Sequence, residues 1–209
     1  MGRRVGMLAA VSERGGRGQC RGPTRWLVAG YAGLAGFFLL EGLLRHSGSS
    51  ASLRASDQDR GTTRAVVLAY AVASDVPLLS RWLPGRPLPS AAAPAGLLVQ
   101  VTGLALRAWS MRALGASYTR TLRTEDGQQG VVDSGPYRWV RHPGYLGSLL
   151  TWVGFALTSS SAPVLALIAG LLGGVYRRRI IVEEQLLRRD LPGYATYSER
   201  TKKLIPILW

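Results

Sequence analysis

The sequence predicts an all-α integral-membrane protein, a bundle of about five transmembrane helices that ends in a helical hairpin. Three observations support this fold class. The hydrophobic fraction is 47% of 209 residues, and the mean hydropathy is +0.10 although 18% of the residues are charged. The apolar residues are gathered into stretches close to the roughly 20 residues that cross a bilayer. The basic residues between these stretches are arginines, and Lys202 and Lys203 are the only lysines of the chain. The length suits one domain.

Charge and cysteine content exclude several function classes. The formal net charge is +14, but the basic residues lie between apolar segments rather than along one soluble face with aromatic residues interleaved. We therefore interpret them as membrane-flanking charges and predict the lipid bilayer, and no nucleic acid, as a partner. Cys20 is the only cysteine, which excludes an internal disulfide and a multi-cysteine zinc site. We predict no metal site.

The N-terminal part divides into a tail and a first span. Residues 1–25 are rich in arginine and glycine, and we predict a disordered tail before a single domain over residues 26–209. The first apolar segment, Trp26–Leu44, is too long for the apolar region of a signal peptide, and no small-residue cleavage site clearly follows it. Its glycines recur every third residue, at Gly30, Gly33 and Gly36, which favours close helix packing. Glu41 near its end is expected at the membrane interface.

The second and third apolar segments are Ala65–Leu83 and Ala95–Met111. An acid inside a membrane segment is a functional candidate by default, which draws attention to Asp75. Two other interpretations compete: Asp75 lies near the helix end, or it pairs with an arginine such as Arg107. We expect Arg107 to extend its side chain to the interface.

The fourth and fifth apolar segments, Tyr145–Thr158 and Val164–Tyr176, are separated by a five-residue uncharged link. So short a link predicts an antiparallel helical hairpin. The fifth segment continues without a helix breaker to Arg188, so we expect one helix that leaves the membrane. Pro192-Gly193 then ends it, and Tyr194–Lys203 is expected to form a short amphipathic helix.

Basic residues predict the orientation. Residues 107–143 carry six arginines and the chain after residue 176 carries eight basic residues, whereas the link between the last two spans carries none. The two basic regions are therefore expected in the cytoplasm and the link outside. With five spans the N-terminus would lie outside, where its arginines break the rule. The number of spans, the side of the N-terminus and the oligomeric state stay open at this point.

One stretch combines turn residues, charges and aromatic rings at the start of an apolar segment: Ser134-Gly135-Pro136-Tyr137-Arg138-Trp139-Val140-Arg141-His142-Pro143-Gly144-Tyr145-Leu146-Gly147. Proline and glycine fix or relax the backbone there. Glu183-Glu184 follows on the extended fifth helix. The hairpin would bring His142 and Glu183 together, which suits a site where a polar ligand meets an apolar wall.

The order Gly-Pro-Tyr, Arg-His-Pro-x-Tyr-x-Gly and Glu-Glu resembles the isoprenylcysteine carboxyl methyltransferase and phospholipid methyltransferase family, over about Leu114 to Trp209. The resemblance implies an integral-membrane methyltransferase that uses S-adenosyl-L-methionine in a pocket on the cytosolic side. Its acceptor would be lipophilic, most simply the carboxylate of an isoprenylcysteine-like substrate.

The family's functional positions can be assigned to residues of this sequence one by one. The resemblance implies substrate binding and catalysis by Arg179. It implies cofactor contacts by Gln129, Gly130, Val131, Val132, Tyr137, His142, Pro143, Gly144, Tyr145 and Glu183, and the neighbouring Glu184 is included with them. In the family a glutamine further upstream also contacts the cofactor. The corresponding position in this chain falls near Arg123, across a gap in the match, and this is a departure from the family's pattern.

Each of these residues has a simpler interpretation. His142 could cap a helix, and the two glutamates could be solvated partners of Arg179 and Arg188 four residues away. The aromatic residues could form an interfacial belt. Three other functions compete with carboxyl methylation: N-methylation of a phospholipid or amine, for which Glu184 or His142 would be the base; an NADPH-dependent sterol-type reductase; and a scaffold without activity.

Overall fold

A computed structural model describes residues 22–44, 60–115 and 131–204, and these residues are almost entirely helical. The helices are α1 (Gly22–Leu43), α2 (Thr62–Asp75), α3 (Ala92–Leu114), α4 (Pro143–Thr158), α5 (Ala162–Asp190) and α6 (Tyr194–Arg200), with 3₁₀ turns η3 (Val76–Trp82) and η5 (Gly135–Arg138). Only isolated β-bridges, and no strands, occur in these three ranges. The predicted all-α class is confirmed.

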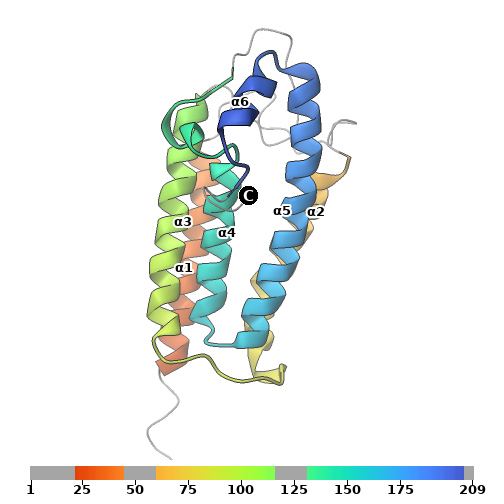
Figure 1. Cartoon of the computed structure of the whole chain (residues 1–209). Coiled ribbons are helices and arrows are strands. Elements are labelled where there is room, and N and C mark those ends of the chain that lie inside the picture. Colours follow the sequence, from red (N-terminus) through yellow and green to blue (C-terminus); the bar gives the residue numbers. More distant parts are fainter. Residues whose placement is uncertain (1–21, 45–59, 116–130, 205–209) are drawn as a thin grey trace, which may run out of the picture.

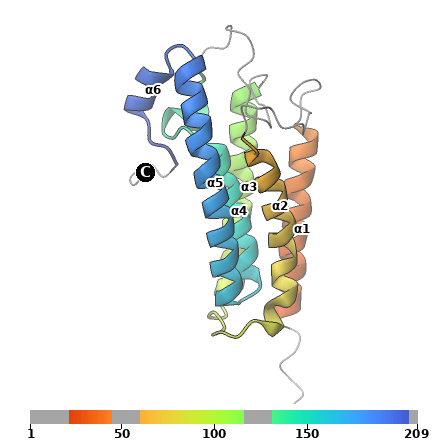
Figure 2. The same ribbon diagram turned by 90° about the vertical axis from the view of Figure 1, so that its right-hand side faces the viewer.

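Helices α1 to α5 run up and down beside one another (Figure 1). α1 begins at the end of the bundle where the link between α4 and α5 lies, and α2 turns back along it. The connector after η3 runs past this link, where Leu88 N–H donates to the Ser160 carbonyl at 2.9 Å. Figure 2 shows α2 next to α5, and α6 beside the end of α5 that lies farthest from this link. The start of α4 and the end of α5 therefore reach the same end of the bundle.

Glycines bring α3 and α4 into backbone contact. A Cβ built on Gly103 would lie 2.4 Å from Thr151 N, and one on Gly154 would lie 2.4 Å from Gln100 N. The glycines predicted to pack in α1 do so at two of three positions. A Cβ on Gly30 would meet Thr158, and one on Gly33 would meet Gln100. The prediction is wrong for Gly36, which has no atom within 4 Å of its built Cβ.

Aromatic and branched side chains fill the space between the helices. Trp152 and Phe155 of α4 and Ile168 of α5 are fully buried. Tyr70 of α2 stacks on Trp152 with ring centroids 4.8 Å apart. Burying each such ring removes a large apolar surface from solvent, so these contacts join α2, α4 and α5.

A buried ion pair joins α1 to α3. Arg107 Nε lies 2.8 Å from Glu41 Oε1, and both side chains are about nine-tenths buried. Each of these side chains neutralises the other inside the bundle, and the placement of Glu41 and Arg107 at the membrane interface stays a prediction. The suggested Asp75–Arg107 pair is replaced by this one. Asp75 is the last residue of α2, as the helix-end interpretation proposed.

Several predicted boundaries shift. α1 begins at Gly22, inside the predicted tail 1–25, and α2 begins at Thr62, before the predicted segment start at Ala65. The second segment is not one helix: α2 ends at Asp75, before Pro77, and the chain continues as η3. The fifth segment is a single 29-residue helix, as predicted. Among the described residues, two stretches, Thr24–Leu43 and Thr62–Ser80, are long and apolar enough to cross a membrane by length and composition.

The C-terminal segment folds back over the start of α4. α6 ends at Arg200, earlier than the predicted Lys203. The residues that follow Arg200 do not continue the helix, because the carbonyls of Lys202 and Lys203 accept hydrogen bonds from Arg141 N–H and His142 N–H, at 2.8 and 3.0 Å. The segment before α4 is thereby fixed in place.

Candidate active site

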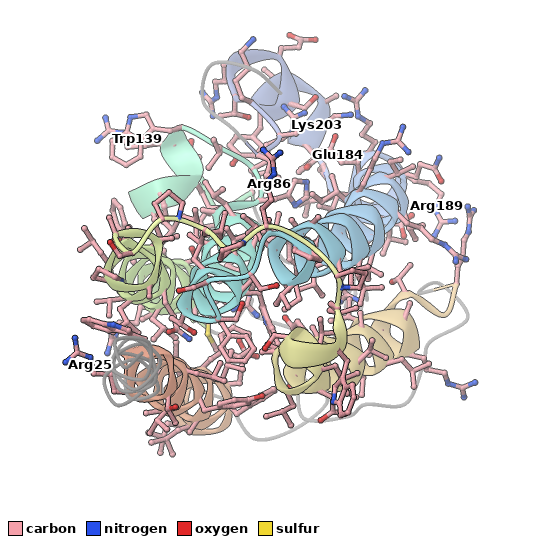
Figure 3. The ribbon with its side chains drawn as sticks, turned by 90° about the horizontal axis from the view of Figure 1, so that it is seen from below. Arg25, Arg86, Trp139, Glu184, Arg189 and Lys203 are labelled. Carbon is pink, nitrogen blue, oxygen red and sulfur yellow. The ribbon has the colours of Figure 1, made fainter. Side chains whose placement is uncertain are left out.

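The candidate site lies where the start of α4, the polar half of α5 and the C-terminal segment meet. Pro143 occupies the first turn of α4, where its missing N–H costs no helical hydrogen bond. His142 directly precedes it and is buried. Figure 3 labels Glu184 on α5 and Lys203 on the C-terminal segment. His142 contacts both, Glu184 through its ring and the Lys203 carbonyl through its backbone N–H.

The predicted approach of His142 to Glu183 is present. His142 Nδ1 lies 3.7 Å from Glu183 Oε2. This oxygen is buried and, within the described residues, accepts no hydrogen bond. An unsatisfied buried acceptor costs about 1–3 kcal/mol and calls for an explanation. It is the feature of this site that a ligand donor would satisfy.

Glu184 is the centre of a hydrogen-bond network. Its Oε1 accepts from Arg141 Nε at 2.7 Å, from His142 Nε2 at 3.0 Å and from the Tyr194 hydroxyl at 3.0 Å. Burial by itself raises the pKa of Glu184, but the hydrogen bonds and positive charges of His142 and Arg141 outweigh it and hold the pKa at about 2. Glu184 therefore stays a carboxylate that ties α4, α5 and α6 together.

The two glutamates are not equivalent, because the Glu184 side chain is 7% exposed and the Glu183 side chain is 22% exposed. Arg188 Nε is 3.9 Å from Glu184 Oε2, but Glu184 is only 5% exposed, so the interpretation of a solvated pair is wrong. His142 is the N-cap residue of α4, and its carbonyl accepts from the N–H groups of Tyr145 and Leu146. Its side chain makes no cap hydrogen bond and faces the glutamates instead.

Arg179 lies on α5 and is 5% exposed. Its Nε donates to the Tyr145 hydroxyl at 2.7 Å, and its Nη1 donates to the hydroxyls of Thr62 and Thr63 at 3.3 and 3.0 Å. Tyr145 in turn stacks on His142, with ring centroids 5.6 Å apart. The site is therefore continuous from Thr62 on α2, through Arg179 and Tyr145, to His142 and the two glutamates.

The remaining predicted residues lie around this core. Tyr137 is buried, and its carbonyl accepts a hydrogen bond from the Tyr197 hydroxyl at 2.6 Å. Gly144 faces α3, where an added Cβ would lie 2.9 Å from Arg107 Nη1. Val131 lies near the turn at Gly193, and Val132 is half-buried. Gln129, Gly130 and Arg123 fall outside the described residues. Of the proposed aromatic belt, Tyr137 is buried and Trp139 is 53% exposed.

Sequence reasoning missed four participants: Arg141 and Tyr194, which hold Glu184, and Thr62 and Thr63, which hold Arg179. Pro192-Gly193 signalled a turn that would return α6 towards α5, but nothing in the sequence paired Tyr194 with Glu184. A cavity of about 420 Å³ also opens beside η5 and α6, lined by Asp133, Ser134, Gly135, Arg138, Tyr197, Arg200 and Thr201. None of the predicted contact residues lines it. The described residues hold no group of three acids, histidines or cysteines suited to a metal.

Several known proteins are similar to this chain. The sequence profile of the phospholipid methyltransferase family matches residues 92–192, which include α3, the His142 stretch and nearly all of α5. A probable protein-S-isoprenylcysteine O-methyltransferase of Oryza sativa subsp. indica is 27% identical over 115 residues, 54% of this chain and 60% of that protein. The family profile covers just under half of this chain, and these matches show that the chain is similar to phospholipid and isoprenylcysteine methyltransferases.

Two further comparisons extend the set of similar proteins. The cobalt-zinc-cadmium resistance protein CzcN of Cupriavidus metallidurans is 35% identical over 78 residues, 37% of this chain and 36% of that protein. The chain thus spans about a third to three-fifths of the length of these curated relatives. The structure of the eukaryotic intramembrane Ras methyltransferase ICMT superposes with a TM-score of 0.64 over 90% of this chain and 69% of that one, at 19% identity. That likeness shows a shared fold.

Proposed function

We propose that this protein uses S-adenosyl-L-methionine to methylate the carboxylate of a lipophilic, isoprenylcysteine-like acceptor at a membrane. The observation that carries the proposal is the buried, unsatisfied Glu183 Oε2 facing His142, close to the buried guanidinium of Arg179. Similarity to methyltransferases indicates the reaction class. The Glu183 carboxylate would accept hydrogen bonds from the cofactor, and the Arg179 guanidinium would pair with the substrate.

The residues present fit the cofactor. S-adenosyl-L-methionine supplies an electrophilic methyl group on a sulfonium, and it carries an ammonium and a ribose diol, both hydrogen-bond donors. Glu183 would accept from one of these groups. Tyr145 and His142 form a stacked aromatic surface next to Glu183. Arg141 and Tyr194 keep Glu184 in place and so keep His142 turned towards Glu183.

The chain's own contribution to the reaction is positioning. A carboxylate acceptor is already ionised at neutral pH and needs no base. Arg179 would orient it, because a guanidinium binds a carboxylate through two parallel hydrogen bonds. Holding two reactants in reactive geometry accounts for several kcal/mol of a barrier, about 7–11 in the best cases.

The site also bears on the choice between a carboxylate and an amine acceptor. An amine must lose a proton, and Glu184 and His142 are the two candidates for its base. With a pKa of about 2 and three hydrogen-bond donors on one oxygen, Glu184 is too weak a base for this role. N-methylation of a phospholipid amine remains the second candidate because the matching family profile is that of phospholipid methyltransferases.

The outer surface of the bundle supports a membrane setting. Val28, Leu68 and Leu98 are 63%, 66% and 70% exposed, on α1, α2 and α3. Such apolar side chains on a helical bundle suit contact with lipid. We propose a multi-pass arrangement with the His142 end in the cytoplasm and the Ser160 link outside.

The test is calorimetric titration of the detergent-purified protein with S-adenosyl-L-methionine, for the wild type and for Glu183→Gln. The substitution keeps the shape but removes the charge, so we expect micromolar binding in the wild type and at least a tenfold loss in the variant. Glu199→Gln is the matched control, because Glu199 is exposed on α6 and should bind as the wild type does.

Other outcomes would contradict the proposal. Tight NADPH binding without S-adenosyl-L-methionine binding would indicate a reductase. A folded protein that binds neither ligand would indicate a scaffold. If the cofactor binds, transfer of a labelled methyl group to a prenylcysteine analogue, measured beside transfer to phosphatidylethanolamine, separates the carboxylate acceptor from the amine acceptor.

A further inference from the structure

The cavity beside η5 and α6 has a basic lining. Arg138 of η5 and Arg200 of α6 both line it, and Asp133 is the one acid among the described residues that form its wall. Its volume of about 420 Å³ lies in the range of sites that hold a small molecule or a headgroup. The cavity therefore combines the size of a ligand site with an excess of positive charge.

Arg138 is exposed and has no carboxylate or hydrogen-bond partner within the described residues. Its guanidinium carbon lies over the Trp139 ring, 5.3 Å from the ring centroid. Contact with a ring occupies the face of a guanidinium and leaves the N–H groups in its plane for an anion. Those N–H groups match the oxygens of a phosphate in pairs.

Arg200 faces the same cavity but has an acidic partner. Its Nη2 lies 2.8 Å from Asp133 Oδ2, and the two side chains are 62% and 56% exposed. Water screens an ion pair as exposed as this one, so the pair is weakly held. A phosphate in the cavity can therefore share Arg200 with Asp133 or displace its carboxylate.

Two tryptophans lie next to the cavity. Trp109 on α3 and Trp139 after η5 are 46% and 53% exposed, their ring centroids are 5.9 Å apart, and Figure 3 shows Trp139 pointing away from the bundle. Gly135 lines the cavity and also touches this pair, since a Cβ built on it would lie 3.3 Å from Trp109 Nε1. Tryptophan is enriched where hydrocarbon meets the lipid headgroups. The cavity thus adjoins the level of the lipid phosphates.

We propose that this cavity binds the phosphate of an anionic phospholipid, with Arg138 and Arg200 as its ligands and Trp109 and Trp139 as interfacial anchors. The inference goes beyond methyl transfer and uses only the membrane setting of the bundle. None of the residues assigned to the cofactor or the acceptor lines the cavity, so this lipid is a separate ligand and not the methyl acceptor. A zwitterionic choline headgroup is disfavoured, because its cation would lie near two arginines.

The bound lipid connects two elements that enclose the candidate active site. η5 leads into His142, and α6 carries Tyr194, which donates to Glu184. The Tyr197 hydroxyl already joins η5 to α6 by donating to the Tyr137 carbonyl at 2.6 Å. A phosphate held from both elements adds a second connection, so anionic lipid stabilises this end of the bundle.

The experiment measures lipid binding to the detergent-purified full chain by native mass spectrometry. The probes are phosphatidylglycerol and phosphatidylcholine with the same acyl chains, and glycerol 1-phosphate serves as a competitor without acyl chains. The variants are Arg138→Gln, Arg200→Gln and Asp133→Asn. Arg177→Gln is the matched control, because it removes the same charge from an exposed position on α5 that does not line the cavity.

We expect the wild type to bind phosphatidylglycerol at least tenfold more tightly than phosphatidylcholine, as an ionic hydrogen bond to the phosphate allows. Arg138→Gln and Arg200→Gln should each lose most of this preference, and Arg177→Gln should keep it. Asp133→Asn should strengthen the preference, because it removes the carboxylate that competes for Arg200. A damaged fold would weaken binding, so this gain separates the site from a general effect on folding.

Three results would overturn the inference. One is a wild type that binds both lipids equally. Another is a preference that survives in both arginine variants, which would assign it to the overall positive charge of the protein. The third is displacement of phosphatidylglycerol by glycerol 1-phosphate, which would indicate a site for a soluble phosphate. Each of these results leaves the titration with S-adenosyl-L-methionine, and so the proposed function, unaffected.

Discussion

Glu183 and Glu184 are adjacent in the sequence, but their surroundings differ. Successive residues on a helix point about 100° apart, so Glu184 faces Arg141 and Tyr194 while Glu183 presents an oxygen without a hydrogen-bond partner among the described residues. We infer that Glu184 contributes stability and Glu183 contributes ligand binding. Substitutions at the two positions should therefore have separable effects.

Glu184→Gln tests the stabilising half of this division. The folded-state pKa of about 2 lies below the ordinary value of 4.5, so the carboxylate's contribution is fully present above about pH 4.5 and is lost as the pH falls towards 2. At neutral pH the variant leaves Arg141 buried without its carboxylate and should lose about 3 kcal/mol.

Thermal unfolding between pH 7 and pH 2.5 measures this effect. The difference in Tm between the wild type and Glu184→Gln should be largest near neutral pH and should shrink on acidification. Glu199→Gln should follow the wild type throughout. A difference that is constant with pH would show that the charge of Glu184 does not stabilise the fold.

At the scale of elements, the contact between α3 and α4 depends on glycine. Gly103 and Gly154 face backbone atoms of the opposite helix at distances that no Cβ tolerates. Backbone atoms cannot move aside as a flexible side chain does, so α3 and α4 would have to separate. This contact also places Arg107 against Gly144, directly beneath the start of α4 that carries His142.

Gly103→Ala should therefore destabilise the protein by about 1–3 kcal/mol, the usual cost of overpacking. It should also weaken cofactor binding, because the helix that carries His142 shifts. Gly170→Ala is the matched control: Gly170 is helical and has no atom within 4 Å of its built Cβ, so alanine there should be neutral or slightly stabilising. The Tm values of Gly103→Ala and Gly170→Ala test this prediction. Equal values would show that α3 and α4 can accommodate a Cβ at Gly103 without loss of stability.

At the scale of the whole molecule, the bundle has two unlike ends. One carries the start of α4, the end of α5 and α6, and the other carries the link at Ser160 and the connector at Arg86 (Figures 1 and 3). The start of α1 lies at the Ser160 end, so the described part is compatible with an N-terminus outside. The arginines of the tail then remain an exception to the charge rule.

Cysteine labelling tests this orientation. In a protein with Cys20 replaced by serine, Arg86→Cys and Arg189→Cys place single thiols at exposed positions of opposite ends. We expect a membrane-impermeant maleimide to label the first in intact cells and the second only after lysis. Labelling in the reverse order would place the candidate site outside the cytoplasm.

Local sequence was enough to establish the helical class, the continuous α5 and the meeting of His142 with Glu183. Apolar runs, proline and glycine breaks and a short link act over a few residues, and they limit where a helix begins, ends and turns back. The family motif is local as well, so the reaction class followed from it. Boundaries moved by a few residues because packing extends helices beyond their apolar runs.

Only the tertiary structure decided which partners the charged residues have. Arg107 pairs with Glu41 and not with Asp75, Glu184 with Arg141 and Tyr194, and Arg179 with the first turn of α2. These partners lie on different helices, and no periodicity within one segment specifies the rotation of one helix against another. Burial then sets the outcome, since a charge removed from water must find its partner among the residues that packing brings near.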